Sequence, residues 1–130
     1  MHVFVDTNVW IAALIARGTC AELVDHLIAQ HVIWYSPLVD EEVLRVLSEK
    51  FGYSEGRVRG VKLWLEDVAR CTPRIDDAPE ITGDRADDFV LKAALEAPSE
   101  VLVTGDSDLL DVDVDAALVI VEPAGFWRIG

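Results

Sequence analysis

Short runs of β-branched and aromatic residues alternate with longer stretches of helical periodicity along this chain. This alternation is typical of strands joined by crossover helices, which build a parallel sheet with helices on both faces. We therefore expect a single α/β domain over residues 1–130, a length that suits one domain. The five expected strands cover residues 2–5, 32–35, 71–75, 100–104 and 118–121.

The helices between these strands are predicted from apolar residues that recur every three or four positions. Ser36 with Pro37 predicts a helix start, because serine caps the amino end and proline fits the first turn. Ser54 predicts a second start, and Thr19 with Glu22 predicts a capping box. The helices are expected over residues 7–16, 19–30 and 86–97, after Ser36-Pro37, after Ser54, and as one turn over 106–110.

Acidic residues stand where two of the expected strands end. Asp6 follows residues 3–5, and Asp106 follows the run that ends in Thr104-Gly105. Residues just past the carboxyl ends of parallel strands line the ligand crevice of such sheets. Two further carboxylates, Glu42 and Asp87, lie on the apolar sides of their helices and are expected to join them. Converging carboxylates suit a hard divalent cation, which in turn suits hydrolysis of a phosphate ester.

Each of these acids also has a purely structural interpretation. Asp6 is equally suited to capping the helix that begins beside it, and acids at helix starts are favoured by the helix dipole. The combination favours a cation, because repulsion costs about 4 kcal/mol per close pair of carboxylates at an effective dielectric constant of 20. The remaining acids near these segments are expected to face solvent: Asp40, Glu41, Asp111, Asp113 and Asp115.

In this order, four segments resemble the motifs of PIN domains, and above all those of the bacterial toxins of toxin–antitoxin systems. The segments are Val3-Phe4-Val5-Asp6-Thr7-Asn8, Ser36-Pro37 with Glu42, Asp84-x-x-Asp87-Asp88, and Val103-Thr104-Gly105-Asp106-Ser107-Asp108. The resemblance implies a three-layer α/β/α PIN-like fold with a central parallel sheet. It also implies an acidic pocket that holds one or two Mg²⁺ or Mn²⁺ ions.

The resemblance assigns catalytic and metal-binding roles to four acids, namely Asp6, Glu42, Asp87 and Asp106. Asp88 is the alternative to Asp87, Asp108 is a further candidate ligand, and Asn8 and Thr104 match accessory polar positions. The implied activity is an endoribonuclease that hydrolyses single-stranded RNA or the unpaired parts of structured RNA. Similarity to VapC-type toxins further implies an antitoxin partner and a homodimer.

The net charge of the chain argues against simple binding to nucleic acid. Its 24 acidic and 11 basic residues give a net charge of −13, whereas nucleic-acid binding relies on basic surfaces. A catalytically inactive PIN-like module that binds a protein partner therefore remains the alternative. A small Mg²⁺-dependent phosphatase is disfavoured, because Asn8 stands where a second aspartate would be needed.

No membrane partner is expected, because the apolar runs are too short to span a bilayer. Cys20 and Cys71 show no metal-binding spacing and are predicted to be buried thiols of a reducing compartment. The expected location is the cytoplasm.

Overall fold

A five-stranded sheet forms the centre of the computed structural model, which describes residues 1–112 and 117–129. The strand order is β3-β2-β1-β4-β5, and every neighbouring pair is parallel. The parallel sheet of five strands predicted from the alternating pattern is therefore confirmed. Its strands are β1 (His2–Val5), β2 (Val32–Tyr35), β3 (Arg70–Cys71), β4 (Val101–Val103) and β5 (Val119–Val121).

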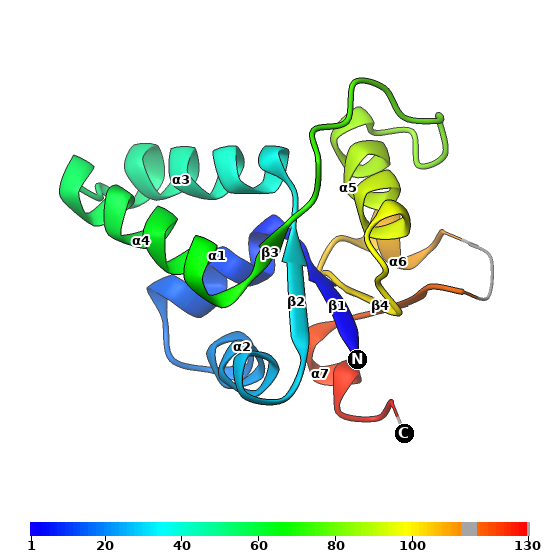
Figure 1. Cartoon of the computed structure of the whole chain (residues 1–130), viewed down its shortest axis with the longest axis horizontal. Coiled ribbons are helices and arrows are strands. Elements are labelled where there is room, and N and C mark those ends of the chain that lie inside the picture. Colours follow the sequence, from blue (N-terminus) through cyan, green and yellow to red (C-terminus); the bar gives the residue numbers. More distant parts are fainter. Residues whose placement is uncertain (113–116, 130) are drawn as a thin grey trace.

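Helices cover both faces of this sheet, which gives the expected three-layer α/β/α arrangement. Figure 1 shows α1 to α4 on one side of the strands and α5 with α6 on the other. The final helix, α7, follows β5 and packs near α2. The helices are α1 (Thr7–Ile15), α2 (Thr19–Gln30), α3 (Pro37–Phe51), α4 (Glu55–Val68), α5 (Arg85–Glu96), α6 (Ser107–Leu110) and α7 (Pro123–Phe126).

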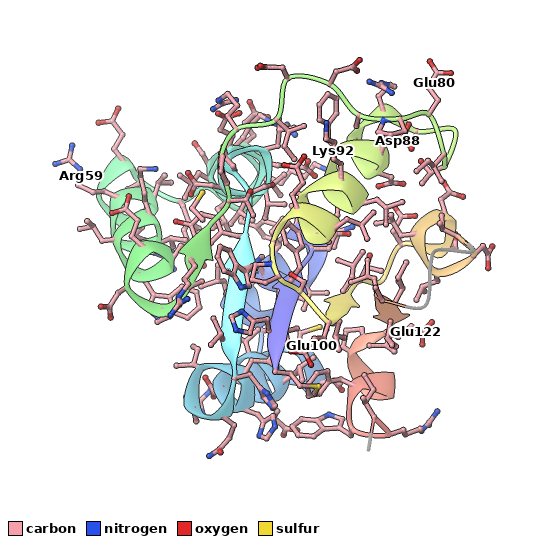
Figure 2. The ribbon with its side chains drawn as sticks, turned by 45° about the vertical axis from the view of Figure 1, so that its right-hand side comes forward. Arg59, Glu80, Asp88, Lys92, Glu100 and Glu122 are labelled. Atoms are coloured by element: carbon pink, nitrogen blue, oxygen red, sulfur yellow. The ribbon has the colours of Figure 1, made fainter. Side chains whose placement is uncertain are left out.

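The two central strands carry the core because helices bury them from both sides. Residues 3–5 and 101–103 are fully buried, as expected of parallel strands that read as continuous apolar runs. Trp10 of α1 is also fully buried, and its indole N–H donates to the Val5 carbonyl over 3.0 Å. This bond fixes the start of α1 against the carboxyl end of β1. Charged side chains such as Arg59 and Glu122 project outward (Figure 2).

Two of the three predicted helix caps are present. The Ser36 hydroxyl accepts from the Val39 N–H, and the Ser54 hydroxyl accepts from the Arg57 N–H. The capping box at Thr19 is wrong. The Gly18 carbonyl accepts from the Glu22 N–H over 3.0 Å, so the helix already includes Thr19 and its side chain is one position too late to cap.

The third strand is shorter than predicted, covering Arg70–Cys71 rather than 71–75. Thr72 still donates its N–H to the Tyr35 carbonyl, but Pro73 has no N–H with which to continue the ladder. Because this strand lies at the sheet edge, Cys71 is exposed. Cys20 is only half-buried, so the prediction of two buried thiols is wrong.

The acids expected to face solvent behave in different ways. Glu41 and Asp111 are exposed, as predicted. Asp40 is not, because α4 packs beside α3 and its Lys62 ammonium lies 3.0 Å from the Asp40 carboxylate, which is 13% exposed. Asp113 and Asp115 lie outside the described residues. Within the ranges that the structure describes, the helices are too short or too polar to cross a membrane.

Candidate metal centre

The candidate site lies where the chain leaves two adjacent strands, β1 and β4. Val5 and Val103 are paired in register, and the Asp6 N–H donates to the Val103 carbonyl over 3.0 Å. After β1 the chain continues toward β2 on one side, whereas β4 leads to β5 on the other. Such a change of direction in an open parallel sheet is where ligands usually bind.

Asp6 is buried at this point and both of its carboxylate oxygens accept hydrogen bonds. Oδ1 accepts from the Thr7 N–H over 2.7 Å, so the residue does cap α1. Oδ2 accepts from the Thr104 hydroxyl over 2.7 Å. Burial raises the pKa of Asp6, the two hydrogen bonds lower it in part, and the nearby Asp106 raises it. Asp6 therefore caps a helix and also faces the other acids.

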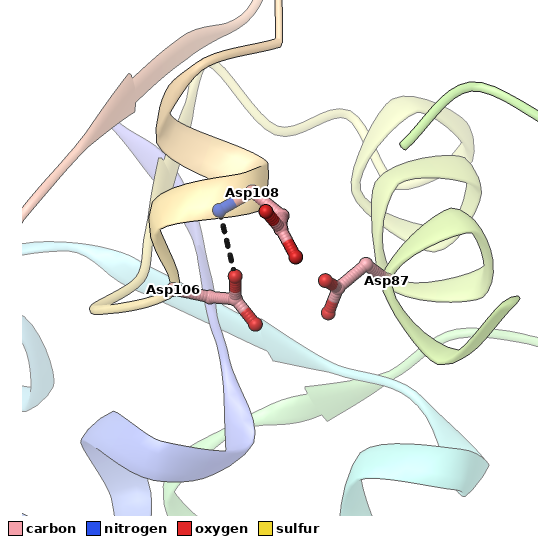
Figure 3. Close-up of side chains that lie close together, drawn as sticks. All are labelled: Asp87, Asp106 and Asp108. Carbon is pink, nitrogen blue, oxygen red and sulfur yellow. Dashed lines mark hydrogen bonds between the residues drawn. The ribbon is translucent and has the colours of Figure 1, made fainter. Parts of the chain in front are cut away.

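Three carboxylates converge beside Asp6. Asp87, Asp106 and Asp108 each offer an oxygen, and these oxygens lie within 4.8 Å of one another. Figure 3 shows Asp87 reaching from α5 toward the other two, which come from the start of α6. The Asp106 Oδ1 accepts from the backbone N–H of Asp108 over 2.8 Å, so Asp106 caps α6 and its carboxylate is held next to Asp108. We call these three residues the acidic trio.

Asp87 is the most perturbed member of the acidic trio. It is 8% exposed, and its Oδ2 is buried with no hydrogen-bond partner among the described residues. Burial, followed by the charge of Asp106, raises its pKa from 3.8 to about 7. A divalent cation would give this oxygen a partner and offset the repulsion between the three carboxylates. An all-carboxylate donor set of this kind fits a hard cation such as Mg²⁺ or Mn²⁺.

Glu42 lies on α3, close enough to Asp6 for the two charges to interact. It is half-buried, and burial raises its pKa, with Asp6 as the next largest cause. The charge of Asp6 also acts on Asp87. The four predicted acids therefore act on one another through their charges, but Asp6 and Glu42 lie outside the acidic trio.

Asp88 is engaged elsewhere, although it follows Asp87 directly. Its Oδ1 accepts from the N–H groups of Ile81 and Thr82 and from the Thr82 hydroxyl, over 2.8–3.1 Å. These bonds, led by the Thr82 N–H, hold the pKa of Asp88 below its usual value. Asp88 therefore anchors the loop before α5, and its neighbour Asp87 is the one that belongs to the acidic trio.

Three further polar residues belong to the same sequence motifs as these acids: Asp84, Thr104 and Asn8. Asp84 caps α5, since its Oδ1 accepts from the N–H groups of Ala86 and Asp87. Thr104 is fully buried, and its hydroxyl both donates to Asp6 and accepts from the Asp106 N–H over 3.0 Å. Asn8 is exposed on the first turn of α1 and has no side-chain hydrogen bond among the described residues.

Sequence comparison identifies a family. A family model described as a PIN domain matches residues 2–108. No curated protein matches the chain significantly.

Structural comparison gives a fold match. The chain is similar to one in the crystal structure of VapBC2 from Rickettsia felis bound to a DNA fragment from their promoter, with a TM-score of 0.64. The match covers 92% of this chain and 97% of that chain at 14% sequence identity. At this identity the likeness shows the fold alone.

Proposed function

Since the chain belongs to the PIN-domain family, we propose that it is a divalent-metal-dependent endoribonuclease that hydrolyses phosphodiester bonds in single-stranded RNA. The observation that carries this proposal is the acidic trio with the unpartnered, buried Oδ2 of Asp87. Uncompensated carboxylates at such a distance destabilise a fold, so a bound cation explains why they converge.

The proposed ligands follow from the geometry. Asp87, Asp106 and Asp108 would hold one Mg²⁺ or Mn²⁺ ion, and Asp6 and Glu42 would support that ion or hold a second one. Such an ion acidifies a bound water and offsets charge on the phosphate. In this assignment Asp88 is not a ligand, because the loop before α5 already occupies its Oδ1.

The neighbouring polar groups have positioning roles in this proposal. Thr104 keeps Asp6 and Asp106 in a fixed relation, since it bonds to the side chain of one and the backbone of the other. Asn8 stands two positions after Asp6 with a free amide, where it suits contact with a phosphate oxygen or a water.

We further propose that the chain is the toxin of a type II toxin–antitoxin pair, with a tightly bound antitoxin, a homodimeric state and a cytoplasmic location. The support is the family together with the likeness in fold to VapBC2 over nearly the whole of both chains.

Cleavage of a mixed single-stranded RNA by the purified protein, in Mn²⁺, Mg²⁺ or EDTA, tests the nuclease. Asp106→Asn should abolish metal-dependent cutting, because it removes one of the converging carboxylates. Asp25→Asn is the matched control, since Asp25 is an exposed acid on α2. Equal cutting by the parent and Asp106→Asn would refute the assigned site.

The net charge of −13 favours one other function, a catalytically inactive module that binds a basic protein partner. Such a module needs no metal. Calorimetric titration with Mn²⁺ separates the two functions: the nuclease requires binding that Asp106→Asn weakens, whereas the module is favoured by the absence of both binding and cutting.

A further inference from the structure

The basic residues of this acidic chain are concentrated in one segment. Residues 45–74 contain seven of the 11 lysines and arginines but only four of the 24 acids, so this segment carries a net charge of +3 and the rest carries −16. The segment comprises residues 45–51 at the end of α3, the whole of α4, and β3. A polyanion approaching the protein would therefore meet attraction here and repulsion over most of the remaining chain.

These two helices form a groove. Figure 1 shows α3 and α4 side by side and projecting away from the strands. Between them is an open groove of about 460 Å³, lined by Ser48, Glu55, Val58, Arg59 and Lys62. Figure 2 shows Arg59 at the opposite side of the molecule from Asp88 and Glu80.

The cations continue from this groove to the candidate metal centre. Lys62 pairs with Asp40, and Arg74 pairs with Glu41, the two residues that directly precede Glu42. Their partners Asp40 and Glu41 are consecutive residues of α3, so both ion pairs lie at the start of that helix. A chain of phosphates that passes Lys62 and Arg74 thus arrives beside Glu42.

Several cations of the segment are not engaged with acids. Lys50, Arg57, Arg59 and Arg70 are exposed and make no ion pair within residues 1–112 and 117–129. The Arg57 guanidinium lies 3.8 Å from the centre of the Tyr53 ring, and that of Arg70 lies 5.9 Å from the centre of a Trp34 ring. Exposed cations next to aromatic rings are typical of surfaces that bind single-stranded nucleic acids.

We propose that the surface running from Arg57 and Arg59 through Lys62 to Arg74 binds the phosphate backbone of single-stranded RNA as it approaches Glu42 and the acidic trio. This inference rests on the proposed nuclease function and adds where the substrate lies. At physiological ionic strength, dissolved ions screen the interaction between exposed charges beyond a distance of about 8 Å. A phosphate group at this surface therefore responds to the nearby cations more than to the net charge of the whole protein. The pairing of Lys62 and Arg74 with the two residues before Glu42 favours RNA over an acidic protein, because it leads the cations to the candidate metal centre.

The test is binding of a labelled single-stranded RNA in EDTA, measured by fluorescence anisotropy across a range of KCl concentrations. The variant is Arg57→Gln with Arg59→Gln. Arg17→Gln with Arg128→Gln is the control, because it removes the same charge from exposed positions outside the segment. Loss of two phosphate contacts should weaken binding about tenfold at 0.15 M salt and reduce the log–log salt slope by about 1.4, while the control binds like the parent.

If RNA binding is weakened equally in the variant and the control, or in neither, then this surface is not the RNA-binding site. Metal-dependent cleavage by the parent, measured on the same preparation, shows separately whether the proposed nuclease function holds. If the parent binds poly-glutamate through Arg57 and Arg59 but does not bind RNA, then the occupant is an acidic protein and the proposal is wrong.

Discussion

The Thr104 hydroxyl donates a 2.7 Å hydrogen bond to the Oδ2 of Asp6, across 98 positions of sequence. Both residues are buried, and they stand at the carboxyl ends of the two adjacent central strands. The same hydroxyl accepts from the Asp106 N–H. The Thr104 side chain therefore links Asp6 and Asp106, the two acids that follow the strands. Its loss should lower the stability of the fold and weaken metal binding.

Thr104→Val should lower the free energy of unfolding by about 2 kcal/mol, because it leaves a buried carboxylate oxygen without its donor. It should also weaken Mn²⁺ binding, since the orientation of Asp6 is no longer fixed. Urea unfolding and calorimetric titration measure the two effects. Thr104→Ser keeps the hydroxyl and should bind Mn²⁺ like the parent; weaker binding by Thr104→Ser than by Thr104→Val would contradict this role.

Asp87→Asn and Asp88→Asn should have opposite effects on the metal-free protein. Asp87→Asn removes repulsion within the acidic trio and should raise the melting temperature while abolishing Mn²⁺ binding. Asp88→Asn weakens the bonds that hold Ile81 and Thr82 and should lower the melting temperature. Thermal unfolding in EDTA, followed by Mn²⁺ titration, distinguishes them. The reverse pattern would mean that Asp88 is the ligand.

The stability of the metal-free protein should fall as pH rises from about 5 to 7. The pKa of Asp87 is about 7 in the folded protein and 3.8 in its ordinary state, so between these values the folded protein binds more protons than the unfolded chain. The raised pKa values of Asp6 and Glu42 act in the same direction. Urea unfolding in EDTA at pH 5, 6, 7 and 8 measures this.

Saturating Mn²⁺ should remove this loss of stability, because the ion binds the ionised carboxylates and competes with protons. Asp87→Asn should show a flatter pH profile than the parent in EDTA. An equal change in stability from pH 5 to 7 in Asp87→Asn and in the parent would show that Asp87 does not carry the raised pKa.

Much of the fold could be predicted because its signals are local. The buried runs at residues 3–5 and 101–103 mark central strands, and Ser36-Pro37 marks a helix start. Asp6 and Asp106 could be paired because parallel strands end at the same edge of the sheet. Asp87 lies three, four and seven positions before Val90, Leu91 and Ala94, so helical spacing alone predicts that its side chain faces the core.

What could not be predicted depends on contacts between segments. Asp88 is even more buried than Asp87, but the loop before α5 occupies its carboxylate, and no periodicity in the sequence reveals that contact. Asp108 is exposed but still belongs to the acidic trio, because Asp106 caps the short helix that contains Asp108 and the two acids lie close together. Asp40 is shielded by Lys62, which is 22 positions away on the next helix.

An anomalous difference map from crystals soaked in Mn²⁺ would show whether the acidic trio binds a metal, because it locates the ion independently of any activity. We expect a peak within about 2.2 Å of carboxylate oxygens of Asp87, Asp106 and Asp108. A fully occupied peak on Asp88, or ordered crystals with no peak near the acidic trio at saturating Mn²⁺, would contradict it.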